Sequence, residues 1–218
     1  MMQTVIFDMD GVLVDTEPVH HLAYERQFQE LQISVDEEIY ASFTGNSTPN
    51  IFMKLKEMFG LSQSVDELTA TKLKYFNEAF ESHADLQLMP GVLPLIKNLH
   101  HNGIQLLIAS SSAPNTIERV VNRFALQPYF SHLISGEEFP KSKPDPAIFL
   151  RAVALSKTPK ENCLIVEDST NGIKAARAAG VFCIGYANRG QNPQDISAAN
   201  MKIDDFSELS FDRLQDLI

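Results

Sequence analysis

Two aspartates lie two residues apart, directly after a short apolar run near the start of the chain. The run is Thr4-Val5-Ile6-Phe7, and Asp8 and Asp10 follow it. A run rich in β-branched and aromatic residues predicts a buried strand, and the carboxyl ends of parallel strands face the ligand site in α/β proteins. Carboxylates so close together are unfavourable unless a cation or a reaction compensates. The pair therefore indicates metal or acid–base chemistry, or else a local turn or helix cap.

Polar residues also end three later apolar segments. Ser110, Ser111 and Ser112 follow one run, and their hydroxyl and N–H groups can hold phosphate oxygens. Lys143 precedes a proline, where an extended segment can aim its charge at a phosphoryl group. Glu167 and Asp168 end another run, and such acids are oxygen ligands of the kind Mg2+ prefers. Taken singly, each position also has a local explanation, as a turn, a solvated loop lysine or a helix cap.

The elements that must position these residues alternate between strand and helix. Strand and helix alternation predicts an α/β fold, with a doubly wound, Rossmann-like parallel sheet covered on both faces. Gly103 and Gly180 follow helical segments and are predicted helix ends. The predicted strands are 4–7, 104–109, 132–134, 163–166 and 182–186, and the predicted helices between them are 92–102, 115–124, 146–155 and 171–179.

Residues 15–88 depart from this alternation. They carry helix-period segments at 19–31, 51–59 and 65–82 and no clear strand pattern. We therefore expect a smaller all-helical domain at 15–88, inserted into a core made of residues 1–14 and 89–218. The insert has 13 Asp+Glu and 5 Lys+Arg, a net charge of −8, whereas the remaining residues have a net charge of −2. Most of these charges are expected on solvated helix faces.

The composition excludes some classes of partner. A net charge of −10 over 218 residues, without a basic patch, argues against nucleic acid or an anionic membrane. No signal-peptide pattern begins the chain, and no apolar stretch approaches the roughly 18 residues of a membrane span. We expect a cytoplasmic monomer that acts on a small molecule. Cys163 and Cys183 lie in apolar runs and are expected to be reduced core thiols.

The four strand ends, with Asp/Asp, Ser, Lys and Glu/Asp in that order, resemble the haloacid dehalogenase (HAD) superfamily over nearly the whole chain. The insert resembles the helical cap of that family. Asp15-Thr16-Glu17-Pro18, together with His20, resembles the branch that contains β-phosphoglucomutase and small-molecule phosphatases. The resemblance implies a Mg2+-dependent enzyme that acts on a small phosphorylated metabolite through an aspartyl phosphate.

The resemblance also implies a role for each matching residue. Asp8 matches the nucleophile, and Asp10 matches the general acid and base. Ser110 and the Ser111 N–H group match the phosphate-binding donors, and Lys143 matches the lysine that offsets charge between nucleophile and phosphate. Asp8, Asp168 and the main-chain carbonyl of Asp10 match the Mg2+ ligands, whereas Glu167 is either an adjacent ligand or an acid behind the site. Because a phosphate adds about two negative charges, we expect it to bind poorly without the metal.

The helical insert bears on the choice between hydrolysis and phosphoryl transfer to a sugar. In β-phosphoglucomutases the cap loop carries a Lys-Gly pair followed three residues later by Arg, but here the stretch reads Thr44-Gly45-Asn46-Ser47-Thr48. Lys72 resembles a retained cap lysine. We therefore expect a phosphatase that hydrolyses a sugar or polyol phosphate, with β-phosphoglucomutase, interconverting β-glucose 1-phosphate and glucose 6-phosphate, as the alternative. Thr44, Gly45, Asn46, Thr48 and Lys72 are the candidate substrate contacts in the insert.

Two questions remain open from the residues alone. His20 is expected either to touch the substrate or to steady Asp10, and the residues around Thr48 could equally form a helix-capping turn before Pro49. Among other classes, a dehalogenase would not need the acid at Asp10, and a phosphorylated signalling domain would need neither that acid nor a cap. A non-catalytic module would have no reason to keep all these charges together.

Overall fold

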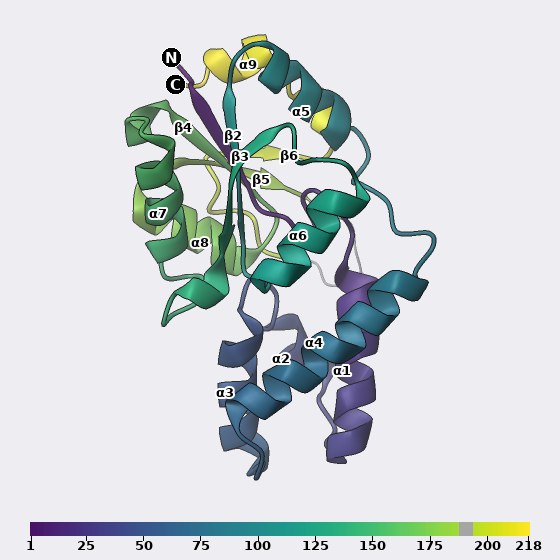
Figure 1. Cartoon of the computed structure of the whole chain (residues 1–218). Coiled ribbons are helices and arrows are strands. Elements are labelled where there is room, and N and C mark those ends of the chain that lie inside the picture. The colour runs from purple at the N-terminus through teal and green to yellow at the C-terminus, as the bar shows by residue number, and fades with distance from the viewer. Residues whose placement is uncertain (188–193) are drawn as a thin grey trace.

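A parallel sheet forms the centre of the protein. The computed structural model describes residues 1–187 and 194–218, and within them six strands pair in the order β3-β2-β1-β4-β5-β6 (Figure 1). All of the pairings are parallel. The strands are β1 (Thr4–Phe7), β2 (Gln105–Ser110), β3 (Phe130–Ser135), β4 (Cys163–Glu167), β5 (Phe182–Tyr186) and β6 (Met201–Ile203).

Residues of each central strand alternate between two hydrophobic cores. Val5 and Phe7 belong to one core, and Ile6 belongs to the other. The first core is closed by α5 (Val92–His101), α6 (Pro114–Arg123) and α9 (Phe211–Gln215), and the second by α7 (Ala147–Ser156) and α8 (Thr170–Ala179). Helices on both faces leave the central strands buried on both sides, which explains why they read as continuous apolar runs. The predicted doubly wound, Rossmann-like fold is confirmed.

The strand order reverses at β1. The chain passes from β1 to β2 and β3 on one side, and then returns to β4, β5 and β6 on the other. In open α/β sheets the ligand crevice lies at such a switch point, outside the carboxyl ends of the strands. Phe7 is in register with Ile108 of β2 and Val166 of β4. The residues that follow these three strands therefore emerge side by side.

Residues Glu17–Ser82 form a layer of helices at the carboxyl end of the sheet (Figure 1). These helices are α1 (Glu17–Leu31), α2 (Glu37–Ala41), α3 (Thr48–Phe59) and α4 (Val65–Ser82). They share a small core that includes Tyr24, Phe43 and Phe52. Val19 of α1 and Phe80 of α4 instead join the large core of the sheet. One end of the helical insert is thus anchored to the sheet while the other packs on itself.

Local capping explains where the helices begin and end. Pro18 lies in the first turn of α1, where a missing N–H costs nothing. Ser64 and Glu67 form a capping box at the start of α4. Gly180 ends α8 with a positive φ of 69°, as the sequence predicts. The division into a core of 1–14 and 89–218 and a cap of 15–88 stays a prediction.

The sequence pattern misses several short elements, among them α2, α9 and β6. Helix α2 has five residues, none of them fully buried, and α9 also has five. Strand β6 has three residues and lies at the edge of the sheet, with Lys202 in its middle. Elements this short do not repeat a helical or strand pattern often enough for periodicity to find them.

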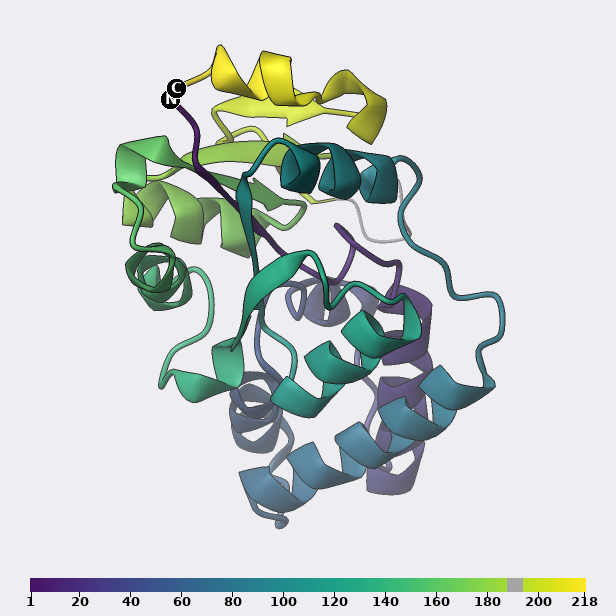
Figure 2. The same cartoon turned by 45° about the horizontal axis from the view of Figure 1, so that its top comes forward.

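Three further observations complete the fold. Both chain ends lie side by side in Figure 2, as in Figure 1, and the Met2 N–H donates to Gln215 Oε1 over 3.0 Å. Cys163 and Cys183 are free and buried, as predicted. No helix among the described residues is long and apolar enough to cross a membrane.

Candidate active site

The candidate catalytic residues converge at the carboxyl edge of the sheet. Asp8 follows β1, Ser110 ends β2 and Glu167 ends β4, while Lys143 lies between β3 and α7. Their side chains are almost fully buried, with exposed fractions of 6% for Asp8, 0% for Ser110, 2% for Lys143 and 1% for Glu167. The structure brings these residues together, as the sequence predicts, but Lys143 lies in the connection after β3 and not at a strand end. Their predicted roles do not follow from position alone.

Lys143 lies at the centre of this cluster. Its Nζ donates to Asp8 Oδ1 over 2.6 Å, to Glu167 Oε1 over 2.7 Å and to the Ala109 carbonyl over 3.3 Å. Burial alone would lower the pKa of Lys143, but Asp8 and Glu167 outweigh it and raise that pKa. The lysine therefore stays charged, although it is removed from water.

The pKa of Asp8 is also raised, which disfavours the charged form of this residue. Burial raises the pKa of Asp8, and repulsion from Glu167 and Asp10 adds to the rise, while Lys143 opposes it. Asp168, which is 7% exposed, adds another carboxyl group to the same cavity wall. One ammonium group thus faces more carboxylates than it can neutralise, and a further positive charge would be favourable here.

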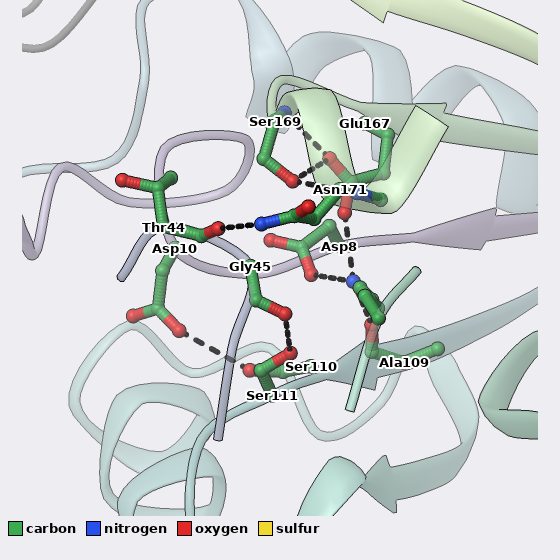
Figure 3. A network of polar contacts seen from close by, with 12 residues as sticks. Asp8, Asp10, Thr44, Gly45, Ala109, Ser110, Ser111, Glu167, Ser169 and Asn171 are labelled. Carbon is green, nitrogen blue, oxygen red and sulfur yellow. Dashed lines mark hydrogen bonds and ion pairs between the residues drawn. The ribbon is translucent and has the colours of Figure 1, made fainter. Parts of the chain in front are cut away.

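Glu167 is held by the start of α8. Its Oε2 accepts hydrogen bonds from the Ser169 N–H over 2.7 Å and from the Ser169 hydroxyl over 2.9 Å (Figure 3). Gly172 packs directly against this carboxylate, and a Cβ there would lie 1.7 Å from Glu167 Oε1. Protein donors therefore engage both oxygens of Glu167, which favours the second of its two expected roles, an acid behind the site.

Asp10 is surrounded by donors. Thr16 donates its hydroxyl to Oδ1, and the hydroxyls of Ser110 and Ser112 donate to Oδ2 over 3.2 and 2.8 Å. His20 Nε2 lies 3.4 Å from Oδ1. Burial would raise the pKa of Asp10, but hydrogen bonds from His20, Thr16 and Ser112 outweigh it and hold the pKa well below its usual range. In this arrangement Asp10 is ionised.

A chain of polar contacts links Asp10 to the helical insert. Lys72 Nζ of α4 lies 2.7 Å from His20 Nδ1, on the ring edge away from Asp10. Lys72 is buried, and its burial lowers its pKa to about 8 despite nearby Asp10 and Glu17. With Lys72 as donor to Nδ1, His20 carries its proton on Nε2 and donates to Asp10. His20 therefore contacts Asp10, in line with one of its two expected roles.

The loop before α3 closes over the site. The Gly45 carbonyl accepts from the Ser111 hydroxyl over 2.8 Å, and the Thr44 carbonyl accepts from Asn171 Nδ2 over 2.9 Å (Figure 3). Gly45 has a φ of +80°, and a Cβ there would lie 2.8 Å from the Ser169 hydroxyl oxygen. Only a glycine allows the loop to approach this closely in that conformation. Asn46 bonds within the insert instead, through Nδ2 to the Ser42 carbonyl over 2.9 Å.

A cavity of about 460 Å³ opens between this loop and the sheet. Ser110, Lys143 and Glu167 are not part of its wall and lie behind it, so their contacts position other groups. All five insert residues that the sequence singles out line the cavity, together with His20. The lining residues among the predicted set are Asp8, Asp10, His20, Thr44, Gly45, Asn46, Thr48, Lys72, Ser111 and Asp168.

Sequence reasoning missed some residues of the site. Thr16 and Ser112 donate hydrogen bonds to Asp10. The sequence pattern gives neither residue a role of its own, and Ser112 stands out only as part of a run of three serines. Tyr24 and Tyr40 line the cavity from the insert. Aromatic residues at helical spacing are typical of a core, so no pattern in the sequence distinguishes them as cavity residues.

The sheet, the buried lysine and the acids define a class of phosphoryl-transfer enzyme, and comparison with known proteins agrees. Residues 5–186 match the model of the haloacid dehalogenase-like hydrolase family, so the chain belongs to that family. It is 28% identical to β-phosphoglucomutase of Bacillus subtilis, over 99% of this chain and 95% of that protein. It is 30% identical to phosphoglycolate phosphatase 1 of Pseudomonas aeruginosa, over 94% and 77% respectively.

A solved structure supports the same class. The β-phosphoglucomutase of Clostridium difficile superposes with a TM-score of 0.86 at 25% identity, over 99% of this chain and 96% of that one. The protein is therefore an enzyme of the HAD family, with relatives that are phosphatases and phosphomutases of small phosphate esters.

Gly172→Ala tests the packing behind Lys143. The new Cβ would displace Glu167 from Lys143, and breaking a buried ion pair costs about 3–5 kcal/mol. We expect a loss of that order in the free energy of unfolding, measured by urea titration, together with lost activity. Gly60→Ala is the control, because a Cβ there meets nothing within 4 Å and costs only the roughly 1–2 kcal/mol of its positive φ.

A double-mutant cycle sharpens this test. Glu167→Asp shortens the side chain and leaves room beside Gly172, so the cost of Gly172→Ala should shrink in that background. An equal cost in both backgrounds would show that the two residues do not clash.

Asp10→Asn tests the role of that carboxyl group. With p-nitrophenyl phosphate the leaving group needs no acid, so Asp8 should still be phosphorylated, but no base remains to activate water. We expect a burst of p-nitrophenolate, equivalent to the enzyme, followed by phosphate release slowed by about 10²–10⁴-fold. Steady release at the wild-type rate without a burst would remove Asp10 from this role.

Proposed function

We propose that the protein is a Mg2+-dependent phosphatase that hydrolyses a small phosphomonoester, a sugar or polyol phosphate, through an aspartyl phosphate on Asp8. The observation that carries the proposal is the position of the Asp8 carboxylate. One of its oxygens is held by buried Lys143 at 2.6 Å, and the residue lines the cavity beside Asp10 and Asp168. A carboxylate held in this way, with an acid–base partner beside it, is suited to attack a phosphoryl group.

The residues fit a bound Mg2+. Asp8 and Asp168 line the same cavity, and the excess negative charge around Lys143 favours a divalent cation. We infer that their carboxylates and the Asp10 carbonyl would hold it. Mg2+ often uses one or two carboxylates, with waters and substrate phosphate completing its shell. The described residues contain no cluster of three or more His, Cys, Asp or Glu side chains arranged for a metal. Because Lys143 and Ser169 already engage both oxygens of Glu167, the proposal does not use this residue as a ligand. Bound Mg2+ would neutralise charge on the phosphate oxygens.

In the first step of the proposed reaction, Asp8 attacks phosphorus in line with the leaving oxygen. Lys143 reduces the repulsion between that carboxylate and the phosphoryl oxygens, and Ser111 lines the cavity beside them. A phosphate dianion beside Asp10 favours its protonated form, and that proton passes to the leaving alcohol. The bond from phosphorus to the alcohol oxygen breaks as the bond to Asp8 forms.

In the second step, Asp10 takes a proton from water, and the water oxygen attacks the aspartyl phosphate. Its ionised resting state, set by Thr16, His20 and Ser112, suits this role. The Lys72–His20 contact holds His20 in place from the insert. Inorganic phosphate leaves and the Asp8 carboxylate is regenerated.

The helical insert acts in this proposal as a cap, residues 15–88, over a core of residues 1–14 and 89–218. Thr44 and Gly45 use their main-chain carbonyls to close the loop on the core, so they shape the cavity. Thr48 and Lys72 line the space for the leaving group. Closure over Asp8 would exclude bulk water while the leaving group departs.

The alternative is a β-phosphoglucomutase. It is favoured by the identity to the Bacillus subtilis enzyme, which extends over almost the whole of both chains. Against it, the loop at Thr44 and Thr48 lacks the lysine and arginine found in that family. A mutase must hold a second phosphate, and this loop offers only hydroxyl and amide groups for it.

Metal-dependent release of phosphate tests the proposal. We expect hydrolysis of p-nitrophenyl phosphate with Mg2+, its loss in EDTA and its recovery when Mg2+ is restored. Asp8→Asn should abolish turnover yet remain folded, because ionised Asp8 is disfavoured by burial and its removal relieves repulsion. Turnover that persists in Asp8→Asn would show that another residue is the nucleophile.

The mutase alternative needs a separate assay. Purified enzyme is incubated with β-glucose 1-phosphate and a trace of the bisphosphate, and glucose 6-phosphate and free phosphate are followed together. Conversion to glucose 6-phosphate faster than hydrolysis would replace the phosphatase by the mutase.

A further inference from the structure

The cavity reaches well beyond the reacting atoms. From Asp8 and Ser111 it extends between the helices of the insert, to residues of α1, of α2 and of the segment between them. This outer part is where the leaving group of a bound phosphomonoester must lie, because Asp8, which is held by Lys143, fixes the phosphoryl end. Its walls therefore select the leaving group.

One wall of the outer part is aromatic. Tyr24, Phe28, Tyr40 and Phe43 line it, and Tyr24 contacts each of the other three rings, with centroids 5.4–6.0 Å apart. Tyr24 and Phe43 are almost fully buried. Rings held this firmly give this wall an apolar surface without a positive charge, which suits an uncharged group better than a second anion.

The charged residues around the same space are mostly acidic. The acids that line it lie in α1 and α2 or in the segments just before these helices: Asp15, Glu17, Glu25, Asp36 and Glu37. These acids belong to the region whose net charge is −8. Several of them are exposed at the mouth, where salt screens each one but where their fields add over the entrance.

Lys72 is the one lysine or arginine among the described lining residues, and it already has partners. Its ammonium lies 2.7 Å from His20 Nδ1 and 4.9 Å from the ring centroids of Tyr24 and Phe76. Asp10, Glu17 and Glu137 all act on its charge. This cation is therefore offset locally, and it does not balance the acids at the mouth.

From the aromatic wall and the acidic mouth of this cavity, we infer that the enzyme selects phosphomonoesters whose leaving group carries no second negative charge. The inference rests on the proposed phosphatase activity. The preferred substrates are monophosphates of uncharged or positively charged alcohols. A bisphosphate or a phosphorylated carboxylic acid brings an extra anion into the outer cavity, where nearby carboxylates oppose it.

This preference would disfavour the reactions after which two of its relatives are named, phosphoglycolate phosphatase and β-phosphoglucomutase. Phosphoglycolate carries a carboxylate beyond its phosphate, and the mutase reaction requires a second phosphate. At neutral pH phosphoglycolate has a charge of about −3, phosphoethanolamine about −1 and ethylene glycol monophosphate about −2. The three share one two-carbon skeleton and differ mainly in the group at its far end.

These three compounds provide the experiment. Values of kcat/KM are measured for each at low ionic strength with saturating Mg2+. We expect kcat/KM for phosphoethanolamine and for ethylene glycol monophosphate to exceed that for phosphoglycolate by about tenfold or more. A difference of this size is what a few partly screened charges within a Debye length produce. The ratio should fall as salt is added.

Variants test whether the acidic mouth causes the preference. Glu25→Gln with Glu37→Gln removes two lining charges, and the disadvantage of phosphoglycolate should shrink severalfold. The control is Glu57→Gln with Asp85→Asn, which removes the same charge at exposed positions outside the cavity lining and should leave the ratio unchanged. Circular dichroism confirms that both pairs remain folded.

The outcomes separate this inference from the proposed function. If phosphoglycolate is turned over as well as or better than the other two, the selection is overturned. If p-nitrophenyl phosphate is not hydrolysed at all, the proposed function fails, and the affinities of the three compounds for Asp8→Asn, measured by calorimetry, decide the selection alone. Equal or tighter binding of phosphoglycolate there would also overturn it.

Discussion

The charge balance around Lys143 is the constraint on which the rest of the site depends. One buried ammonium donates to Asp8 and Glu167 at 2.6 and 2.7 Å, while Asp168 and Asp10 lie close by. Removing so many charges from water is unfavourable unless further hydrogen bonds or a cation compensate. Hydrogen bonds offset part of this cost: Ser169 donates to Glu167, and Thr16, His20 and two serines donate to Asp10. The remaining negative charge is what a divalent cation would neutralise.

The helical insert covers the charged residues around Lys143 and forms the outer part of the cavity. Its loop closes on the core through main-chain carbonyls of Thr44 and Gly45, at a position where only a glycine fits. Its side chains determine the chemistry of the outer cavity. Aromatic rings form one wall, acids lie at the mouth, and buried Lys72 contacts His20. Main-chain atoms of the insert therefore close the loop on the core, whereas the aromatic and acidic side chains of the insert line the outer cavity.

Much of the fold could be predicted from the sequence, and so could the residues that meet at the carboxyl edge of the sheet. The reason is that the strand ends of a parallel sheet must meet at one edge. Asp8, Ser110, Lys143 and Glu167 do converge. The direction of each side chain could not be predicted. Ser110 turns toward Asp10, and Glu167 turns toward Lys143 and Ser169. Short elements such as α2 and β6, and cavity residues such as Tyr24, give no periodic or motif signal that separates them from loop or core.

Chemical trapping of the intermediate tests the central claim most directly. Wild-type enzyme is quenched during turnover of a phosphomonoester, reduced with borohydride, digested and sequenced by mass spectrometry. An acyl phosphate on an aspartate is reduced to homoserine, so the account predicts homoserine at position 8 and an unmodified Asp10. Homoserine at another acid, or a fully unmodified Asp8 under conditions of burst turnover, would contradict it.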